Sequence, residues 1–133
     1  MIDSKNIEKL FKNKRVCIVG DIMLDEYVYT HQQKKSTEYK HVHTSLVYEK
    51  KTYLGGAANV AHNIRKLDST PYLVGVCGND EQGKKLQDLL AKNKISNEYL
   101  IHTNIITTYK KRIFTSNKPS IRIDEEEIKN IQN

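Results

Sequence analysis

The chain has 133 residues, enough for one compact domain and too few for two. Charged residues make up 29% and hydrophobic residues 38% of the chain, a balance typical of a globular rather than a disordered protein. No apolar run approaches the roughly 20 residues of a membrane helix, and the N-terminus lacks the basic and apolar regions of a signal peptide. We therefore expect a cytoplasmic protein that has no membrane partner.

The formal net charge of +6 raises the question of nucleic-acid binding. The basic residues are scattered in short groups, and the sequence contains no aromatic RNA-binding motif and no zinc-finger spacing. A lysine-rich solvated surface is the favoured interpretation, so we expect no nucleic-acid partner. Steep salt dependence of DNA or RNA binding would support the alternative.

The first half of the chain alternates short apolar and mixed segments. Residues 3–12 have apolar side chains at helical spacing, which predicts a helix. Residues 15–20 hold a short apolar run that ends in glycine, which predicts a buried parallel strand. Residues 26–53 are rich in Tyr, Val, Thr and His with polar residues mixed in, which predicts exposed antiparallel strands. Cys17 and Cys77 lie in separate apolar runs without a CxxC spacing, and we expect both to be buried core thiols.

A helix is predicted from Gly55-Gly56 to about Leu67. Its expected apolar stripe consists of Val60, Ile64 and Leu67, with Ala57 and Ala61 beside it. Residues 71–78 predict a second buried strand, and 99–101 a third core strand. Between them, Asp80 is expected to cap a helix that ends near Asn93 and turns three leucines inward: Leu86, Leu89 and Leu90.

Two more strands are predicted at residues 105–114 and 120–124, joined by a turn at 117–119. The polar tail 124–133 would fray or begin another helix. Core strands that alternate with helices predict an α/β fold with a parallel sheet. The exposed strands do not fit this alternation and predict a small antiparallel sheet that stands off the core.

Asp21 and Asp25 follow the first core strand, and ligands of open α/β sheets bind at the carboxyl ends of the strands. A carboxylate there can accept hydrogen bonds from neighbouring sugar hydroxyls; a turn cap and a solvated side chain are equally good interpretations. Gly55 and Gly56 would let the backbone at a helix start approach an oxygen-rich ligand closely. Asn59 and Asn63 lie one turn apart on that helix and would hydrogen-bond to hydroxyls, or they are ordinary surface amides.

Alternation along a strand puts Lys110 and Arg112 on one face and Lys111 on the other. Two cations on one face would hold a phosphate, although a solvated strand face explains them as well. His31, His41 and His43 are too few to indicate a metal site. Neither a Walker A loop nor a GxGxxG fingerprint is present.

Five segments, in this order, resemble the motifs of the ribokinase-like (PfkB) carbohydrate kinases, and among them most of all the bacterial heptose-7-phosphate kinases of ADP-heptose and lipopolysaccharide-core synthesis. The segments are Val19-Gly-Asp-Ile-Met-Leu-Asp-Glu-Tyr27, Gly55-Gly-Ala-Ala-Asn-Val-Ala-His-Asn-Ile64, Leu73-Val-Gly-Val-Cys-Gly-Asn-Asp80, Lys110-Lys-Arg-Ile113 and Ile121-Arg-Ile-Asp-Glu-Glu126. The resemblance spans about residues 10–127 and less than half of a family kinase domain.

The resemblance implies an α/β fold: a partial ribokinase-like parallel sheet flanked by helices, with a small antiparallel β lid. Residues 1–133 would be the N-terminal part of one kinase domain, with a core at 1–25 and 54–103 and a lid at about 26–53 and 104–124. Substrate-binding roles carry over to six residues. Asp25 matches the acidic residue that binds sugar hydroxyls, Gly55, Gly56 and Asn59 match the glycine pair and asparagine of the sugar site, and Lys110 and Arg112 match the basic pair near the substrate phosphate. No catalytic residue and no metal ligand is implied in this chain.

The sequence departs from the family in two places. Residues 34–40 lack the prolines of the Arg-x-Ser-Pro-Glu-Ala-Pro-like segment that heptose kinases usually carry. The sequence also lacks the family's Gly-Ala-Gly-Asp motif, which supplies the catalytic base and an anion hole, and the ATP-binding loops. Because phosphoryl transfer depends on positioning and charge stabilisation, we expect no appreciable turnover by this chain alone.

The resemblance implies ATP and Mg²⁺ as cofactors of a complete enzyme, and neither is expected to bind this chain alone. The expected partners are a sugar phosphate and either a separate C-terminal kinase half or a second copy of the chain, paired through the lid. A non-catalytic sugar-phosphate-binding or dimerising module is the alternative function. Uncovered core strands would make the monomer marginally stable or prone to aggregate.

Overall fold

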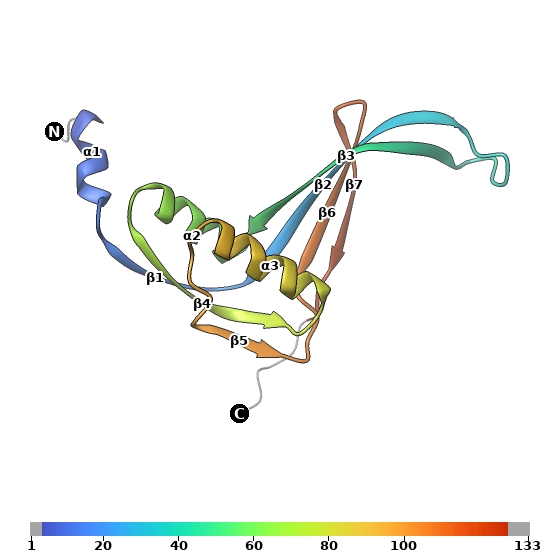
Figure 1. The fold of residues 1–133 in the computed structure, drawn as a ribbon. Helices are drawn as coiled ribbons and strands as arrows, with labels where there is room; N and C mark the ends of the chain where they lie inside the picture. The colour runs from blue at the N-terminus through green and yellow to red at the C-terminus, as the bar shows by residue number, and fades with distance from the viewer. Residues whose placement is uncertain (1–3, 128–133) are drawn as a thin grey trace.

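The computed structural model describes residues 4–127, which form two β-sheets and the helices beside them (Figure 1). The first sheet contains β1 (Arg15–Val19), β4 (Thr70–Gly78) and β5 (Leu100–Thr103), in the order β1-β4-β5. Its strands are parallel throughout. The predicted parallel α/β core is therefore confirmed, with its three strands near the predicted positions.

Three helices accompany the sheets in the described part of the chain: α1 (Ser4–Phe11), α2 (Gly56–Lys66) and α3 (Glu81–Lys92). Helices α2 and α3 lie on the same side of the three-stranded sheet, above it in Figure 1. None of the described helices is long and apolar enough to cross a membrane.

The strand predicted at residues 15–20 forms as β1, but the prediction that it is buried is wrong. Strand β1 alternates between half-buried and exposed residues, and Val19 is 74% exposed. Cys17 is also exposed, against prediction, whereas Cys77 is buried as predicted; both thiols are free. The physical reason is that β1 lies at a sheet edge, and the described residues place α2 and α3 over only one face. Parallel sheets usually have both faces covered. The uncovered face is a structural reason to predict that the isolated chain is marginally stable.

Helix α2 forms close to its predicted bounds but buries different residues. Ala58 and Ala61 are fully buried, whereas Val60 is 47% and Leu67 39% exposed. The predicted stripe of large residues is therefore wrong, and only Ile64 of the three is half-buried. Small residues on the buried face let the helix backbone approach the sheet closely, which leaves no room there for larger side chains.

Helix α3 begins at the predicted cap, and Leu86 and Leu90 are buried with Leu89 half-buried, as predicted. The Asp80 carboxylate accepts hydrogen bonds from the backbone N–H of Gly83 at 2.7 Å and from the backbone N–H and hydroxyl of Thr107 at 2.8 and 2.7 Å. The Thr107 hydroxyl in turn accepts a hydrogen bond from the N–H of Gly78 at 2.9 Å. This network ties the end of β4 and the start of α3 to the chain that enters the second sheet.

Replacing Asp80 with Ala should lower the free energy of unfolding by about 2 kcal/mol, since it removes a helix cap and leaves Thr107 without its acceptor. Burial by itself raises the pKa of Asp80, but the hydrogen bonds from Thr107 and Gly83 hold it below its ordinary 3.8. The contribution of the carboxylate is therefore present above pH 3.8 and is lost as the pH falls through the lower folded-state pKa. Urea unfolding at neutral and acidic pH measures both effects. The exposed Asp88→Ala on the same helix should change little, and an equal loss in both variants would contradict the role of the network.

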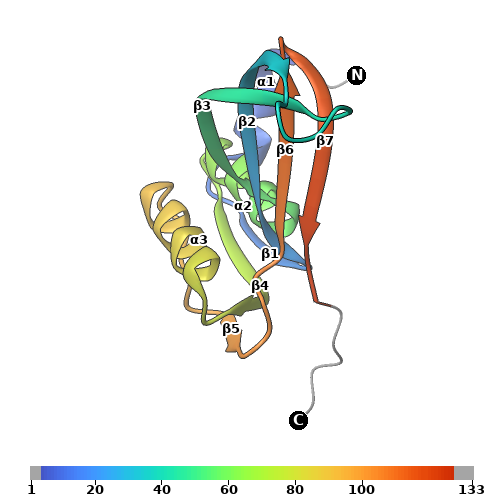
Figure 2. The same ribbon diagram turned by 90° about the vertical axis from the view of Figure 1, so that its right-hand side faces the viewer.

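The second sheet contains β2 (Ile22–Lys35), β3 (His43–Gly55), β6 (Tyr109–Thr115) and β7 (Lys118–Glu125), in the order β3-β2-β6-β7. We call it the lid sheet. Figure 2 shows its four strands side by side. The β2–β3 and β6–β7 pairs are antiparallel, as predicted, and they are joined by a parallel β2–β6 pair.

The β6–β7 turn falls at Ser116 and Asn117, which have positive φ of 50° and 62°. It thus begins one residue before the predicted 117–119. Both central residues of this two-residue hairpin are left-handed, the backbone that matches the twist of the flanking strands. Strand β7 runs to Glu125, so the first residues of the predicted polar tail extend the sheet. The rest of that prediction, from residue 128, lies outside the described residues.

The two sheets share one apolar core at the base of the lid sheet. Leu24, Leu54 and Tyr109, from three different lid strands, are buried together with residues of β4 and α3 such as Leu73, Leu86 and Leu90. The lid strands then extend away from this core (Figure 1). This shared core therefore fixes the position of the residues that follow it at the junction of the lid sheet and the core.

Candidate sugar site

A pocket of about 380 Å³ lies at the junction between the lid sheet and α2. It is lined by Asp25, Tyr27, Tyr29, Tyr53, Leu54 and Asn59. The pocket thus brings together Asp25 of β2 and Asn59 of α2, which are 34 positions apart in the chain. Aromatic walls with a few convergent polar groups are typical of small-ligand sites.

Strand alternation explains the tyrosines. Asp25, Tyr27 and Tyr29 are spaced by two along β2 and therefore share one face. Tyr53 of β3 lies opposite Asp25 in the antiparallel register, and its ring meets that of Tyr27 edge-on at 5.4 Å. Sequence reasoning missed all three tyrosines as site residues, although their period-two spacing from Asp25 was a usable signal.

Gly55 caps the N-terminus of α2 and lies beside Asp25. A Cβ at Gly55 would come within 2.7 Å of Asp25 Oδ2 and of Met23 Cγ. Only a residue without a side chain therefore leaves the Asp25 carboxylate its place beside the helix start.

Gly56 has a φ of +54°, a left-handed conformation that favours glycine. A Cβ there would lie 2.3 Å from the backbone oxygen of Asp21. That oxygen accepts a hydrogen bond from the N–H of Ala57 at 2.8 Å. The glycine pair thus lets the start of α2 approach Asp21 and Asp25 of the same chain. From the sequence, we expected the pair to let a ligand approach instead. The side chains of Asp21 and Asn63 are exposed, and neither lines this pocket.

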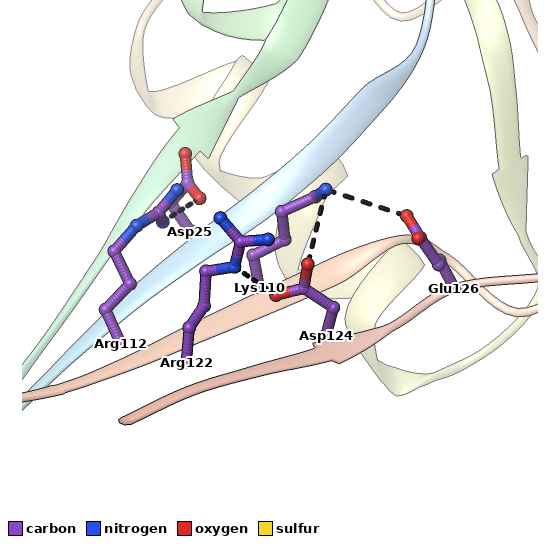
Figure 3. Close-up of polar contacts among 6 residues, drawn as sticks. All are labelled: Asp25, Lys110, Arg112, Arg122, Asp124 and Glu126. Carbon is purple, nitrogen blue, oxygen red and sulfur yellow. Dashed lines mark hydrogen bonds and ion pairs between the residues drawn. The ribbon is translucent and has the colours of Figure 1, made fainter. Parts of the chain in front are cut away.

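Arg112 pairs with Asp25 across the β2–β6 junction. One Arg112 Nη donates a hydrogen bond to Asp25 Oδ1 (Figure 3). The guanidinium lies 5.5 Å from the centre of the Tyr27 ring. The side chains of Asp25 and Arg112 are only 19% and 31% exposed. The hydrogen bond to Asp25 raises the pKa of Arg112 above its ordinary value. Two predicted site residues therefore meet, as an ion pair that holds the carboxylate at the pocket edge.

Lys110 takes different partners. It lies on the same face as Arg112, as predicted, and Figure 3 shows both side chains together. Its Nζ is 3.6 Å from a carboxylate oxygen of Asp124 and 3.6 Å from one of Glu126. Lys111 lies over the ring of the buried Tyr109, on the opposite face, which confirms the predicted alternation. The carboxylates of Asp124 and Glu126 therefore neutralise Lys110. Lys110 does not line the pocket.

The described residues contain no group of three or more His, Cys, Asp or Glu side chains placed to hold a metal ion. His31 instead stacks on Tyr48, with ring centres 4.3 Å apart. The polar groups that line the pocket are one carboxylate, one amide and three tyrosines.

The match to known proteins covers nearly the whole chain. The family model of pfkB family carbohydrate kinases matches residues 13–133. A Campylobacter jejuni protein named "Bifunctional protein HldE" is 36% identical over 117 residues, which are 88% of this chain and 24% of that protein. The Pasteurella multocida protein of the same name is 37% identical over 123 residues, 91% of this chain and 25% of that protein. The chain thus spans about a quarter of the length of these curated relatives.

Solved structures confirm the ribokinase-like fold. Arabidopsis thaliana ribokinase, in a structure described as complexed with ribose and ATP, superimposes with a TM-score of 0.65 at 23% identity, over 86% of this chain and 36% of that one. The nucleoside kinase of Methanocaldococcus jannaschii gives a TM-score of 0.62 at 20% identity, over 86% of this chain and 37% of that one. The chain therefore belongs to the pfkB family of carbohydrate kinases, of which it carries a ribokinase-like portion.

Proposed function

We propose that the chain is the sugar-binding part of an ATP-dependent kinase that phosphorylates a heptose 7-phosphate at C1, in the cytoplasmic synthesis of ADP-heptose for lipopolysaccharide core. The observation that carries the proposal is the meeting of Asp25 and Asn59 at one aromatic-walled pocket, in a chain 34–38% identical to proteins named HldE. Asp25 would accept hydrogen bonds from two sugar hydroxyls, and Asn59 would donate to a third.

The remaining parts of the reaction would come from outside the described residues. ATP, Mg²⁺ and the catalytic base belong, in this proposal, to a separate C-terminal kinase half. Half-exposed β1 supports such an arrangement, because a parallel sheet with one open face can accept packing from a further segment.

An ATP-consumption assay with D-glycero-D-manno-heptose 7-phosphate tests this function. The chain is assayed alone and mixed with a purified C-terminal half of a relative's kinase domain. We expect heptose-dependent ATP consumption only in the mixture, and its loss when the chain carries Asn59→Ala. Asn63→Ala, one helical turn away and outside the pocket, is the matched control and should retain activity. Consumption that is unaffected by Asn59→Ala would contradict the assignment of the pocket.

The second candidate is a non-catalytic module that binds a sugar phosphate or pairs with a second copy through the lid. Two neighbouring aromatic side chains on the lid sheet favour this candidate. The ring centres of Tyr29 and Tyr48 are 6.3 Å apart, and Tyr48 is 48% exposed. Saturable binding of the sugar phosphate without any activity in the mixture would support this candidate over the first.

A further inference from the structure

A row of aromatic side chains runs along one face of the lid sheet and ends at the pocket between the lid sheet and α2. The ring centres of Tyr27 and Phe114 are 5.8 Å apart, and those of Tyr29 and Phe114 are 5.4 Å apart, with both pairs stacked. Tyr53 ends the row at the pocket, and its ring lies at 88° to that of Tyr27. The rings inside the row are therefore stacked on one another, whereas the ring of Tyr53 stands across the row.

Tyr53 is also the most exposed of the three tyrosines that line the pocket. It is 49% exposed, whereas Tyr27 and Tyr29 are half-buried. Tyr53 lies opposite Asp25 in the antiparallel register of β2 and β3, and both side chains line the pocket. A ligand that covers this ring removes apolar surface from water, which favours binding. The pocket therefore offers an exposed flat ring and a carboxylate on neighbouring strands.

These two groups suit the two kinds of surface on a sugar ring. Hydroxyls project from the edge of the ring and can donate hydrogen bonds to the Asp25 carboxylate. In a pyranose of manno configuration, the axial hydrogens of C3 and C5 lie on one face, and C2, C3 and C4 place no axial hydroxyl there. That face, here called the C3–C5 face, is an apolar patch that fits a flat aromatic ring. Aromatic walls combined with a few polar groups are typical of pockets for small molecules.

We infer that Tyr53 is a specificity-determining residue, whose ring packs against the C3–C5 face of the sugar while Asp25 accepts hydrogen bonds from hydroxyls at the ring edge. A sugar with an axial hydroxyl on that face is rejected, because the hydroxyl would be buried against the ring without a hydrogen-bond partner. The inference rests on the proposed function, because the sugar is the heptose 7-phosphate of that proposal. It adds a preference among epimers, set by a residue that lies outside the five motif segments.

Isothermal titration of the full chain with D-glycero-D-manno-heptose 7-phosphate tests the contact. Tyr53→Ala should weaken binding about tenfold, because the sugar loses the aromatic surface on which it packs. Tyr53→Phe keeps the ring and should bind within about twofold of the wild-type chain. Tyr48→Ala is the matched control, because Tyr48 is an equally exposed ring of the same sheet, at 48%, that does not line the pocket. It should leave the affinity unchanged.

A second titration, with the C3 epimer D-glycero-D-altro-heptose 7-phosphate, tests the specificity. The wild-type chain should bind this epimer at least about tenfold more weakly than the manno sugar, because its C3 hydroxyl is axial on the C3–C5 face. Tyr53→Ala should bind the two epimers within about threefold of each other, since the ring that excludes the axial hydroxyl is gone. A purely structural role of Tyr53 would lower both affinities equally and leave their ratio unchanged.

The outcomes separate this inference from the proposed function. An unchanged epimer ratio in Tyr53→Ala, equal losses in Tyr53→Ala and Tyr48→Ala, or a loss in Tyr53→Phe as large as in Tyr53→Ala overturns the inference and leaves the proposed function standing. D-mannose 6-phosphate, which has the same ring configuration, is the third probe. Binding of this probe that depends on Tyr53, without binding of the heptose 7-phosphate, supports the inference and contradicts the proposed function. Saturable binding of none of the three probes overturns both.

Discussion

Replacing Asp25 with Asn should weaken heptose 7-phosphate binding about 100-fold. The carboxylate is expected to accept two charge-assisted hydrogen bonds from the sugar, each worth about 1.5 kcal/mol or more, and each step of about 1.4 kcal/mol changes a dissociation constant tenfold. The neutral amide also removes the ion partner of Arg112. Isothermal titration with the heptose 7-phosphate measures the change.

The control for this variant is Asp88→Asn, the same substitution at an exposed position of α3 outside the pocket. It should bind as the wild-type chain does. Circular dichroism of both variants establishes that the fold is retained. A folded Asp25→Asn chain whose affinity falls less than about threefold would contradict the role of Asp25.

Replacing Gly56 with Ala should destabilise the chain by about 3 kcal/mol. A left-handed backbone costs a residue with a Cβ roughly 1–2 kcal/mol, and the new Cβ would lie 2.3 Å from the backbone oxygen of Asp21. Relief of that contact requires the start of α2 to move away from β2, which would also break the Ala57-to-Asp21 hydrogen bond. The free energy of unfolding in urea measures the loss.

Gly20→Ala is the matched control for Gly56→Ala. A Cβ at Gly20 would meet the Ala57 Cβ at 3.4 Å, an ordinary contact, and the backbone there is not left-handed. We therefore expect a loss below about 1 kcal/mol. Equal stability of the two variants would show that Gly56 is not under the steric restraint described above.

The sequence predicted those features that depend on local chemistry. Residue type and spacing predicted the Asp80 cap and the approximate bounds of α2 and α3. They also predicted that Lys110 and Lys111 lie on opposite faces of their strand. Burial was predicted less well, because it depends on what covers a face. Val19 and Val60 look like core residues by pattern, yet the described residues leave both exposed, at 74% and 47%.

The electrostatics of the site could not be predicted from the sequence, because they depend on strand order. Asp25 and Arg112 are 87 positions apart and meet only because β6 pairs in parallel with β2. Similarly, Lys110 and Arg122 find Asp124 only through the register of β7. The motifs predicted the residues of the candidate site, and the strand pairing determines which of these residues neutralise one another.

The most direct test of the account is to map where D-glycero-D-manno-heptose 7-phosphate binds, by backbone amide and arginine side-chain NMR shifts of the full chain. The account predicts saturable shifts at Asp25, Tyr53 and Asn59 of the pocket between the lid sheet and α2, here called the first pocket, and at the side chain of Arg112. The internal comparison is a lysine-rich pocket near the start of β1. It is lined by Lys9, Lys12, Lys66, Leu67 and Asp68. Shifts confined to that lysine pocket, or no saturable shift at the first pocket, would contradict the central claim that this chain holds the sugar.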